Sequence, residues 1–183
     1  MKTALVLLAD GFEEVEAVTP IDFLRRAGVR VTTLAIGGNR SVLGGHEITI
    51  MADGLIEGHQ GLADAIIVPG GGGGSRNLAA SAAVGRLIQE FQSAGKLVAA
   101  ICAAPAVVLS PLGLLAGKEF TCFPGMETGL TTGKFSAARV VRDGQLITSR
   151  GAGTAAEFAE AIIAALVGDA AAREIHTVTV QPN

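Results

Sequence analysis

The sequence has no tryptophan and no tyrosine, and only two of its 183 residues are cysteine. Cys102 and Cys122 do not make the disulfide framework of a small secreted protein. Neither stands in a CxxC or Cys/His spacing that is typical of a metal site. We therefore expect both thiols to be reduced, and we expect no metal and no cofactor.

Positive charge and long hydrophobic runs are also scarce. The formal net charge is -3, and no basic cluster is larger than Arg25 and Arg26, so there is no electrostatic case for nucleic acid or an anionic membrane. The apolar run at 97–109 is too short to span a bilayer and is broken by Pro105. The amino-terminal run ends at Asp10, too early for a signal peptide. The sequence predicts a soluble cytoplasmic protein.

Apolar small residues are abundant instead. The chain is 49% hydrophobic and 17% charged, a balance that argues against disorder and suits close packing of helices on a sheet. The length suits a single domain over residues 1–183, and we find no repeat and no linker.

Strand and helix patterns alternate along the chain, which is the signature of a parallel sheet covered on both faces. A short β pair is expected within 42–51, a small strand at 120–122, and a hairpin at 140–148 around an Asp-Gly turn. The expected strands of the sheet are 3–9, 29–36, 65–68 and 97–101, and the expected helices are 13/14–27, 75–91 with a break near Ser81, 103–109, and 154–167 with Gly168 after it.

The first expected helix carries two further predictions. We expect its inward face to hold four apolar side chains, Val15, Val18, Phe23 and Leu24. Because Pro20 lacks a backbone N–H, we also expect a kink or a late helix start there.

Cys102 lies where the expected strand 97–101 turns into a helix. Small residues follow it, so the chain can turn sharply, and the unpaired N–H groups of a new helix would favour the thiolate. A buried structural cysteine is equally consistent with this apolar stretch.

Two other stretches end at the same sheet edge as Cys102, namely 10–16 and the glycine run 69–74. Ligands bind at the carboxyl ends of parallel strands, so we expect these stretches to converge. The glycine run lacks the Lys and Ser/Thr of a phosphate loop, which makes an oxyanion-binding loop the simpler interpretation. A flexible turn at 72–74 is the alternative.

Carboxylates and histidines near this edge are few. A carboxyl facing Cys102 would lose water, so its pKa would rise and it could exchange a proton with the sulfur, but spacing does not choose among Glu13, Glu14 and Glu16. None of the histidines neighbours Cys102 in sequence, so we expect surface roles for His46, His59 and His176. Cys122 is interpreted as an inert core thiol.

Four blocks together carry a family resemblance: GFEEVEA at 11–17, VPGG at 68–71, AAICAAP at 99–105 and TSRGAGT at 148–154. In this order they resemble the ThiJ/PfpI superfamily, in the clade of the human Parkinson-disease protein deglycase and bacterial YajL. The resemblance runs over essentially the whole chain.

The resemblance implies a flavodoxin-like α/β three-layer sandwich with a mostly parallel central sheet, a homodimer, and a reactive Cys102 at a nucleophile elbow. It also implies that Glu16 is protonated and hydrogen-bonds the sulfur. The oxyanion donors would be the backbone N–H groups of Gly71 and Ala103, and His46 matches a family position near the partner subunit's site.

Two departures from the family pattern bear on activity. Ala103 replaces the histidine that follows the cysteine in the protease-like branch, so protease activity is disfavoured. Phe123 stands where many members of the clade carry a histidine, and its ring cannot transfer a proton. The resemblance implies a cofactor-independent enzyme acting on reactive dicarbonyls or glycation adducts, of the glyoxalase III or deglycase type. The alternative is a redox sensor or chaperone with an oxidisable Cys102.

Overall fold

The computed structural model describes residues 1–182. Within them a seven-stranded sheet has the order β10-β11-β7-β6-β1-β2-β5, and its neighbouring strands are parallel except for β10 against β11. The strands are β1 (Thr3–Leu8), β2 (Arg30–Ala35), β5 (Gly54–Leu55), β6 (Ala65–Val68), β7 (Leu97–Ile101), β10 (Val140–Asp143) and β11 (Leu146–Ser149). This is the mostly parallel, flavodoxin-like sheet that was expected.

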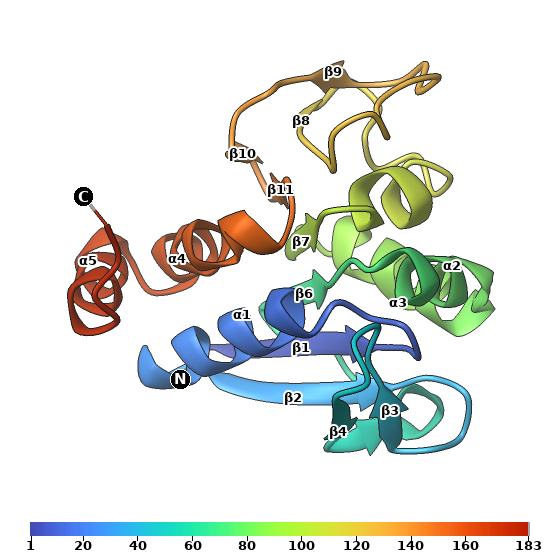
Figure 1. The fold of residues 1–183 in the computed structure, drawn as a ribbon, viewed down its shortest axis with the longest axis horizontal. Coiled ribbons are helices and arrows are strands. Elements are labelled where there is room, and N and C mark those ends of the chain that lie inside the picture. Colours follow the sequence, from blue (N-terminus) through green and yellow to red (C-terminus); the bar gives the residue numbers. More distant parts are fainter. Residues whose placement is uncertain (183) are drawn as a thin grey trace.

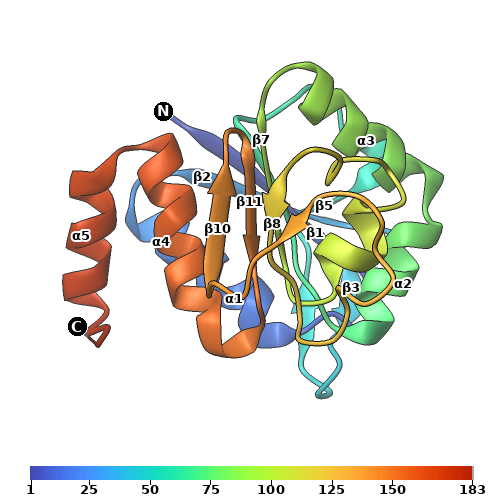
Figure 2. The ribbon, with the colours of Figure 1, turned by 90° about the horizontal axis from the view of Figure 1, so that it is seen from above.

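Helices cover both faces of the sheet (Figures 1 and 2). The layer on one face contains α1 (Glu14–Arg26), α4 (Ala155–Leu166) and α5 (Asp169–Val178), and the layer on the other contains α2 (Gly72–Ala80) and α3 (Ala82–Ser93). In β1, alternate side chains enter the two cores: Val6 and Leu8 pack on the α1 side, and Leu5 and Leu7 pack on the α2 side. A continuously apolar strand is the result of burial on both faces.

The strand order reverses beside β1. The chain moves from β1 outward to β2 and β5, and then crosses back to β6 and continues through β7 to β11. The carboxyl ends of β1, β6 and β7 therefore meet at a topological switch point, the place where open α/β sheets bind ligands.

Smaller elements complete the chain. The expected β pair within 42–51 is an antiparallel hairpin, and the break at Ser81 separates α2 from α3 as predicted. These smaller elements are β3 (Ser41–Leu43), β4 (Thr49–Met51), β8 (Glu119–Phe120), β9 (Lys134–Phe135) and the 3-10 turns Ile56–Gly58 and Ala152–Thr154.

The prediction for the inward face of α1 was partly wrong. Phe23 and Leu24 are buried, but Val15 and Val18 are 48% and 46% exposed. The helix begins at Glu14 and includes Pro20, so the late start was also wrong. Its buried face at this end carries carboxyl groups, and the two valines therefore point to the outside.

Two further elements differ from the expectation. The segment after Cys102 is not a regular α-helix but a π-helix at Pro105–Leu109. A helix that was not expected follows Gly168, since α5 packs on α4 through the buried Ile175. Gly168 ends one helix and directly precedes the next.

Candidate active site

Cys102 occupies a strained turn at the end of β7. Its φ angle is 64°, in the left-handed region that side chains other than glycine rarely adopt. Its backbone N–H donates to the Ser149 carbonyl at 2.9 Å, and its own carbonyl accepts the Phe123 N–H at 2.8 Å. The thiol is partly exposed. The backbone thus has the form of the expected nucleophile elbow, in which a strained residue presents its side chain at the sheet edge.

Glu16 faces this cysteine from the first turn of α1. Its side chain is buried, at 1% exposure, and its Oε2 accepts the Gly70 N–H at 2.9 Å. A Cβ added to Gly70 would lie 2.5 Å from Glu16 Oε2 and 2.6 Å from Cys102 Cβ. The two side chains therefore meet across Gly70, where only a glycine leaves enough room.

The two acids hold their protons unusually tightly. Burial raises the pKa of the Glu16 carboxyl to about 7, although its hydrogen bonds with Cys102 and the Gly70 N–H oppose the shift. Burial and the adjacent Glu16 carboxylate raise the pKa of the Cys102 thiol to about 12. The first proton thus leaves the pair near neutral pH, and a thiolate forms when Glu16 keeps or receives the other proton.

The location of Cys102 alone does not ionise its thiol, contrary to the expectation from a helix N-terminus. The helix that follows is only a five-residue π-helix that begins at Pro105. The groups that favour a thiolate are the backbone N–H groups of Gly71 and Ala103, which lower the pKa of the sulfur.

The glycine run contributes a rigid loop and a helix. Gly71 has a φ angle of 85°, and a Cβ there would lie 2.5 Å from the Gly11 carbonyl oxygen and 2.6 Å from the Glu13 nitrogen. Residues 72–74 form the first turn of α2, so the flexible turn considered for them was wrong. The loop therefore holds the Gly71 N–H in one position beside Cys102.

A second buried carboxyl group, Glu14, binds the β3–β4 hairpin. Its Oε1 accepts the His46 backbone N–H at 2.7 Å, and its Oε2 lies 3.0 Å from His46 Nδ1. Burial opposes ionisation, but these bonds and the Ile48 N–H together lower the pKa of Glu14. The hydrogen bond and the charges of Glu14 and Glu13 raise the pKa of His46.

The ligand atoms of Glu13, Glu14 and His46 lie within 4.8 Å of one another. Because Glu14 and His46 satisfy each other in an ion pair, this cluster connects the hairpin to α1, and we assign no metal to it. The exposed His46 side chain does not contact Cys102 of its own chain in the structure.

Phe123, whose ring has no nitrogen to transfer a proton, lies beside the same site in the structure. A Cβ built on Gly151 would be 3.6 Å from the Phe123 ring and 3.8 Å from Glu16 Oε1. The ring and the carboxyl group therefore border the same space. The TSRGAGT block in the sequence indicates this wall, because it places Gly151 two residues after the end of β11.

The remaining candidates lie apart from this cluster. His59 contacts the Gly61 carbonyl, and His176 pairs with Glu160 at 3.0 Å, as surface roles require. Cys122 is fully buried, and burial raises the pKa of its thiol to about 11, which fits an inert core thiol.

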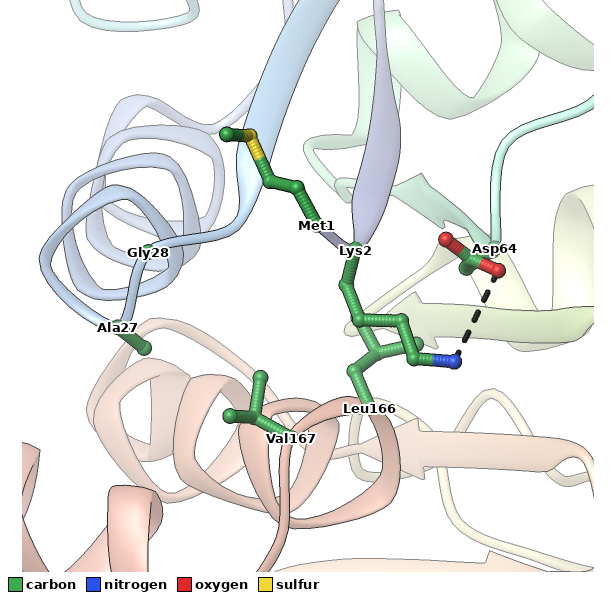
Figure 3. A pocket seen from close by; sticks show the side chains of 7 residues that line it. All are labelled: Met1, Lys2, Ala27, Gly28, Asp64, Leu166 and Val167. Carbon is green, nitrogen blue, oxygen red and sulfur yellow. Dashed lines mark ion pairs between the residues drawn. The ribbon is translucent and has the colours of Figure 1, made fainter.

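A cavity of about 590 Å³ lies at the opposite, amino-terminal edge of the sheet (Figure 3). Its polar side chains are Lys2 and Asp64, which form an ion pair at 3.9 Å. Its lining has no cysteine, histidine or hydroxyl side chain, unlike the cluster around Cys102 at the other edge. None of the helices formed by residues 1–182 has the length and apolar character that crossing a membrane requires.

The fold and the strained turn define an α/β protein of the flavodoxin-like class with a cysteine at the carboxyl edge of its sheet. Comparison with known proteins narrows this class, because residues 2–165 match the DJ-1/PfpI family. The chain belongs to that family.

Three known proteins show the extent of the similarity. The chain is 40% identical to the zebrafish (Danio rerio) Parkinson disease protein 7 homolog, over 95% of this chain and 94% of the relative. It is 35% identical to the Caenorhabditis elegans glutathione-independent glyoxalase DJR-1.2, over 91% and 90% of the two chains. A crystal structure of a DJ-1 superfamily protein from Salmonella typhimurium superposes with a TM-score of 0.96 at 41% identity, covering 100% of both chains.

Proposed function

We propose that this protein is a cofactor-independent enzyme that converts reactive dicarbonyls such as methylglyoxal to hydroxy acids, with Cys102 as nucleophile and Glu16 as acid and base. The observation that carries the proposal is the close approach, across Gly70, of a partly exposed Cys102 and a buried Glu16 carboxyl group whose pKa is about 7. A general acid and base works best when its pKa lies near the working pH. The name of the nematode relative supports the same reaction class.

The first step forms a carbon–sulfur bond. The Cys102 sulfur attacks the aldehyde carbon while its proton passes to the Glu16 carboxylate. The new alkoxide is stabilised by the N–H groups of Gly71 and Ala103, and Glu16 then returns the proton to it, giving a hemithioacetal.

The second step moves a proton between the two neighbouring carbons. Glu16 removes the proton from the former aldehyde carbon and delivers a proton to the former ketone carbon, through an enediol. The product is a thioester of lactate on Cys102. Water then cleaves the thioester and releases lactate and the free thiol, so that the sum is methylglyoxal plus water giving lactate. Removal of early glycation adducts from proteins or nucleotides would use the same nucleophile.

Lactate production from methylglyoxal tests this proposal. We expect Cys102→Ser to abolish turnover, because a serine hydroxyl group loses its proton far less readily than a thiol does. Full lactate production by this variant would overturn the proposal. Cys122→Ser serves as the matched control, since this buried thiol lies outside the proposed machinery, and it should retain turnover.

Phe123→His is a second test of the same mechanism. A histidine at this position would place a titratable ring at the wall of the site, where it could carry protons that Glu16 now has to carry alone. We expect a large gain in the turnover rate. An unchanged rate would show that the missing histidine does not limit the enzyme.

The second candidate function is a redox sensor or chaperone. It is favoured by the N–H groups of Gly71 and Ala103 at the sulfur, which would also stabilise a sulfinate. Two equivalents of hydrogen peroxide would oxidise the Cys102 sulfur in two steps, and each peroxide would be reduced to water. Mass spectrometry after mild peroxide treatment distinguishes this function, since a lack of selective oxidation at Cys102 would exclude it.

We further propose that the protein forms a homodimer and that it works in a reducing compartment such as the cytoplasm. The support is a surface of exposed apolar side chains on α1 and the adjoining β3–β4 hairpin: Val15, Val18, Leu43, Ile48 and Met51. Pairing there would bring the exposed His46 toward the partner subunit. Sedimentation of Val18→Asp tests this interface, because a buried aspartate would shift the protein to monomers. An unchanged mass would place the interface elsewhere.

A further inference from the structure

Phe123 is the most exposed of the phenylalanine side chains. Its exposed fraction is 48%, whereas Phe135 is half-buried and the other rings are buried, namely Phe12, Phe23, Phe91, Phe120 and Phe158. An aromatic ring gains free energy when it leaves water, so a ring left on the surface at a site is available to an apolar ligand.

The backbone fixes this ring beside the nucleophile. The Phe123 N–H donates to the carbonyl of Cys102 itself, at 2.8 Å. This hydrogen bond connects the main chain of Phe123 directly to the strained turn at Cys102, so the side chain of Phe123 leaves the backbone next to the elbow.

The carboxyl group of Glu16 lies between the Cys102 sulfur and the Phe123 ring. Oε2 accepts the Gly70 N–H on the side of Cys102, whereas Oε1 faces Gly151 and the Phe123 ring. Gly151 has no side chain to occupy the space between Oε1 and the ring. A substrate carbon bonded to the sulfur thus has Glu16 beside it and an apolar wall beyond.

We propose that Phe123 is a specificity-determining residue that selects α-oxoaldehydes with an aromatic substituent over methylglyoxal. This inference rests on the proposed function and names its substrate class. The aldehyde carbon binds the sulfur, the ketone carbon lies next to Glu16, and the substituent on the ketone packs against the Phe123 ring. A methyl group reaches little of that ring, while a phenyl group stacks on it.

The ratio of kcat/KM for phenylglyoxal to that for methylglyoxal measures this selection. An aromatic pair supplies a factor of up to about 10 beyond simple area burial. We expect the ratio to fall by about tenfold in Phe123→Ala, mainly through a higher KM for phenylglyoxal, and to fall by less in Phe123→Leu. Leu62→Ala is the matched control, because Leu62 is an exposed apolar side chain outside the site. An unchanged ratio in Phe123→Ala would overturn the inference.

Alkylation of Cys102 separates this inference from the proposed function. N-benzyl and N-ethyl iodoacetamide each form a thioether bond between their methylene carbon and the sulfur and release iodide, and they need no turnover. We expect the benzyl reagent to be preferred, and we expect Phe123→Ala to remove the preference. If the preference depends on Phe123 but no lactate or mandelate forms, the proposed function fails while aromatic recognition stands. If lactate forms, and neither the kcat/KM ratio nor the alkylation preference depends on Phe123, recognition by this ring is wrong while the proposed function stands.

Discussion

Two carboxyl groups on one turn of α1, Glu14 and Glu16, are both hidden from water, but their pKa values are shifted in opposite directions. They are 4% and 1% exposed. Glu14 accepts backbone N–H groups and pairs with His46, and these partners outweigh burial, so its pKa is lowered. Glu16 accepts one backbone N–H and contacts Cys102, and these partners only oppose the effect of burial, which raises its pKa to about 7. The difference shows that burial raises the pKa of a carboxyl group unless hydrogen-bond partners outweigh it, and this separates the group that holds the hairpin from the group that can move a proton.

Replacing each carboxyl group by an amide should separate the two groups most strongly in the rate of lactate formation. Glu16→Gln keeps the size of the side chain but cannot exchange a proton, so we expect the lactate-forming rate to fall by about 10²–10⁴-fold. Steady-state assays measure this fall. Glu14→Gln is the comparison and should reduce the rate far less. Equal losses in the two variants would mean that both carboxyl groups serve the site in the same way.

The pH dependence of stability should also have opposite signs for the two groups. The pKa of Glu16 in the folded protein, about 7, is above the ordinary value of 4.5, so stability is greatest below pH 4.5 and falls as pH rises through 7. The loss amounts to about 3 kcal/mol. For Glu14 the pKa is lowered, so its contribution is present above pH 4.5 and is lost as pH falls below that value.

Urea unfolding at a series of pH values measures both contributions. Between pH 5 and 8, Glu16→Gln should remove most of the decline in the free energy of unfolding. Glu14→Gln should leave that decline in place and flatten the curve at acid pH. A decline that persists in Glu16→Gln would mean that another group causes it.

Two glycines provide the space for these carboxyl groups, and they should tolerate alanine differently. At Gly70 a Cβ would also lie 2.9 Å from the Ile101 carbonyl oxygen, which is backbone and cannot move aside. At Gly44 the three atoms nearest to the Cβ would all belong to the Glu14 side chain. We expect Gly70→Ala to lower stability by about 1–3 kcal/mol and to slow Cys102 alkylation, and we expect Gly44→Ala to lower it less.

Gly72→Ala is the control for the glycine substitutions. Its Cβ would approach only Arg76, at 3.5 Å, in the first turn of α2. Thermal unfolding should show an unchanged or slightly higher midpoint, since alanine favours a helix. If Gly44→Ala proves as damaging as Gly70→Ala, the Glu14 pocket is as rigid as the Glu16 pocket.

The smallest expected effect belongs to the ion pair of Glu14. His46 is exposed, so water screens its charge, and His46→Ala should lower the unfolding midpoint only slightly. The pKa of Glu14 should rise in this variant, which NMR titration of its carboxyl carbon can detect. No rise would mean that the backbone N–H groups alone keep Glu14 ionised.

The sequence was sufficient to predict much of this architecture. Continuous apolar runs identified β1, β6 and β7, and the rule for parallel sheets predicted that 10–16, 69–74 and Cys102 would meet. The choice of Glu16 came from family resemblance, because helical spacing places Glu13, Glu14 and Glu16 within one turn.

Other features depend on contacts that no local pattern encodes. Glu14 is buried because the distant Gly44 leaves room for it and the hairpin supplies N–H groups. Val15 and Val18 are exposed for the same reason, since a carboxyl group takes the inward position that an apolar pattern assigns to valine. The helix α5 was missed because Gly168 ends one helix and begins another.

The left-handed backbone at Cys102 has a consequence for protein engineering. The strain belongs to the main chain and persists for every side chain except glycine, with a magnitude on the order of 1–3 kcal/mol. A sequence optimised for stability alone would place glycine there and would lose its thiol. Screens for thermostable variants of this chain therefore favour inactive ones at this position, and they need a selection for sulfur chemistry alongside.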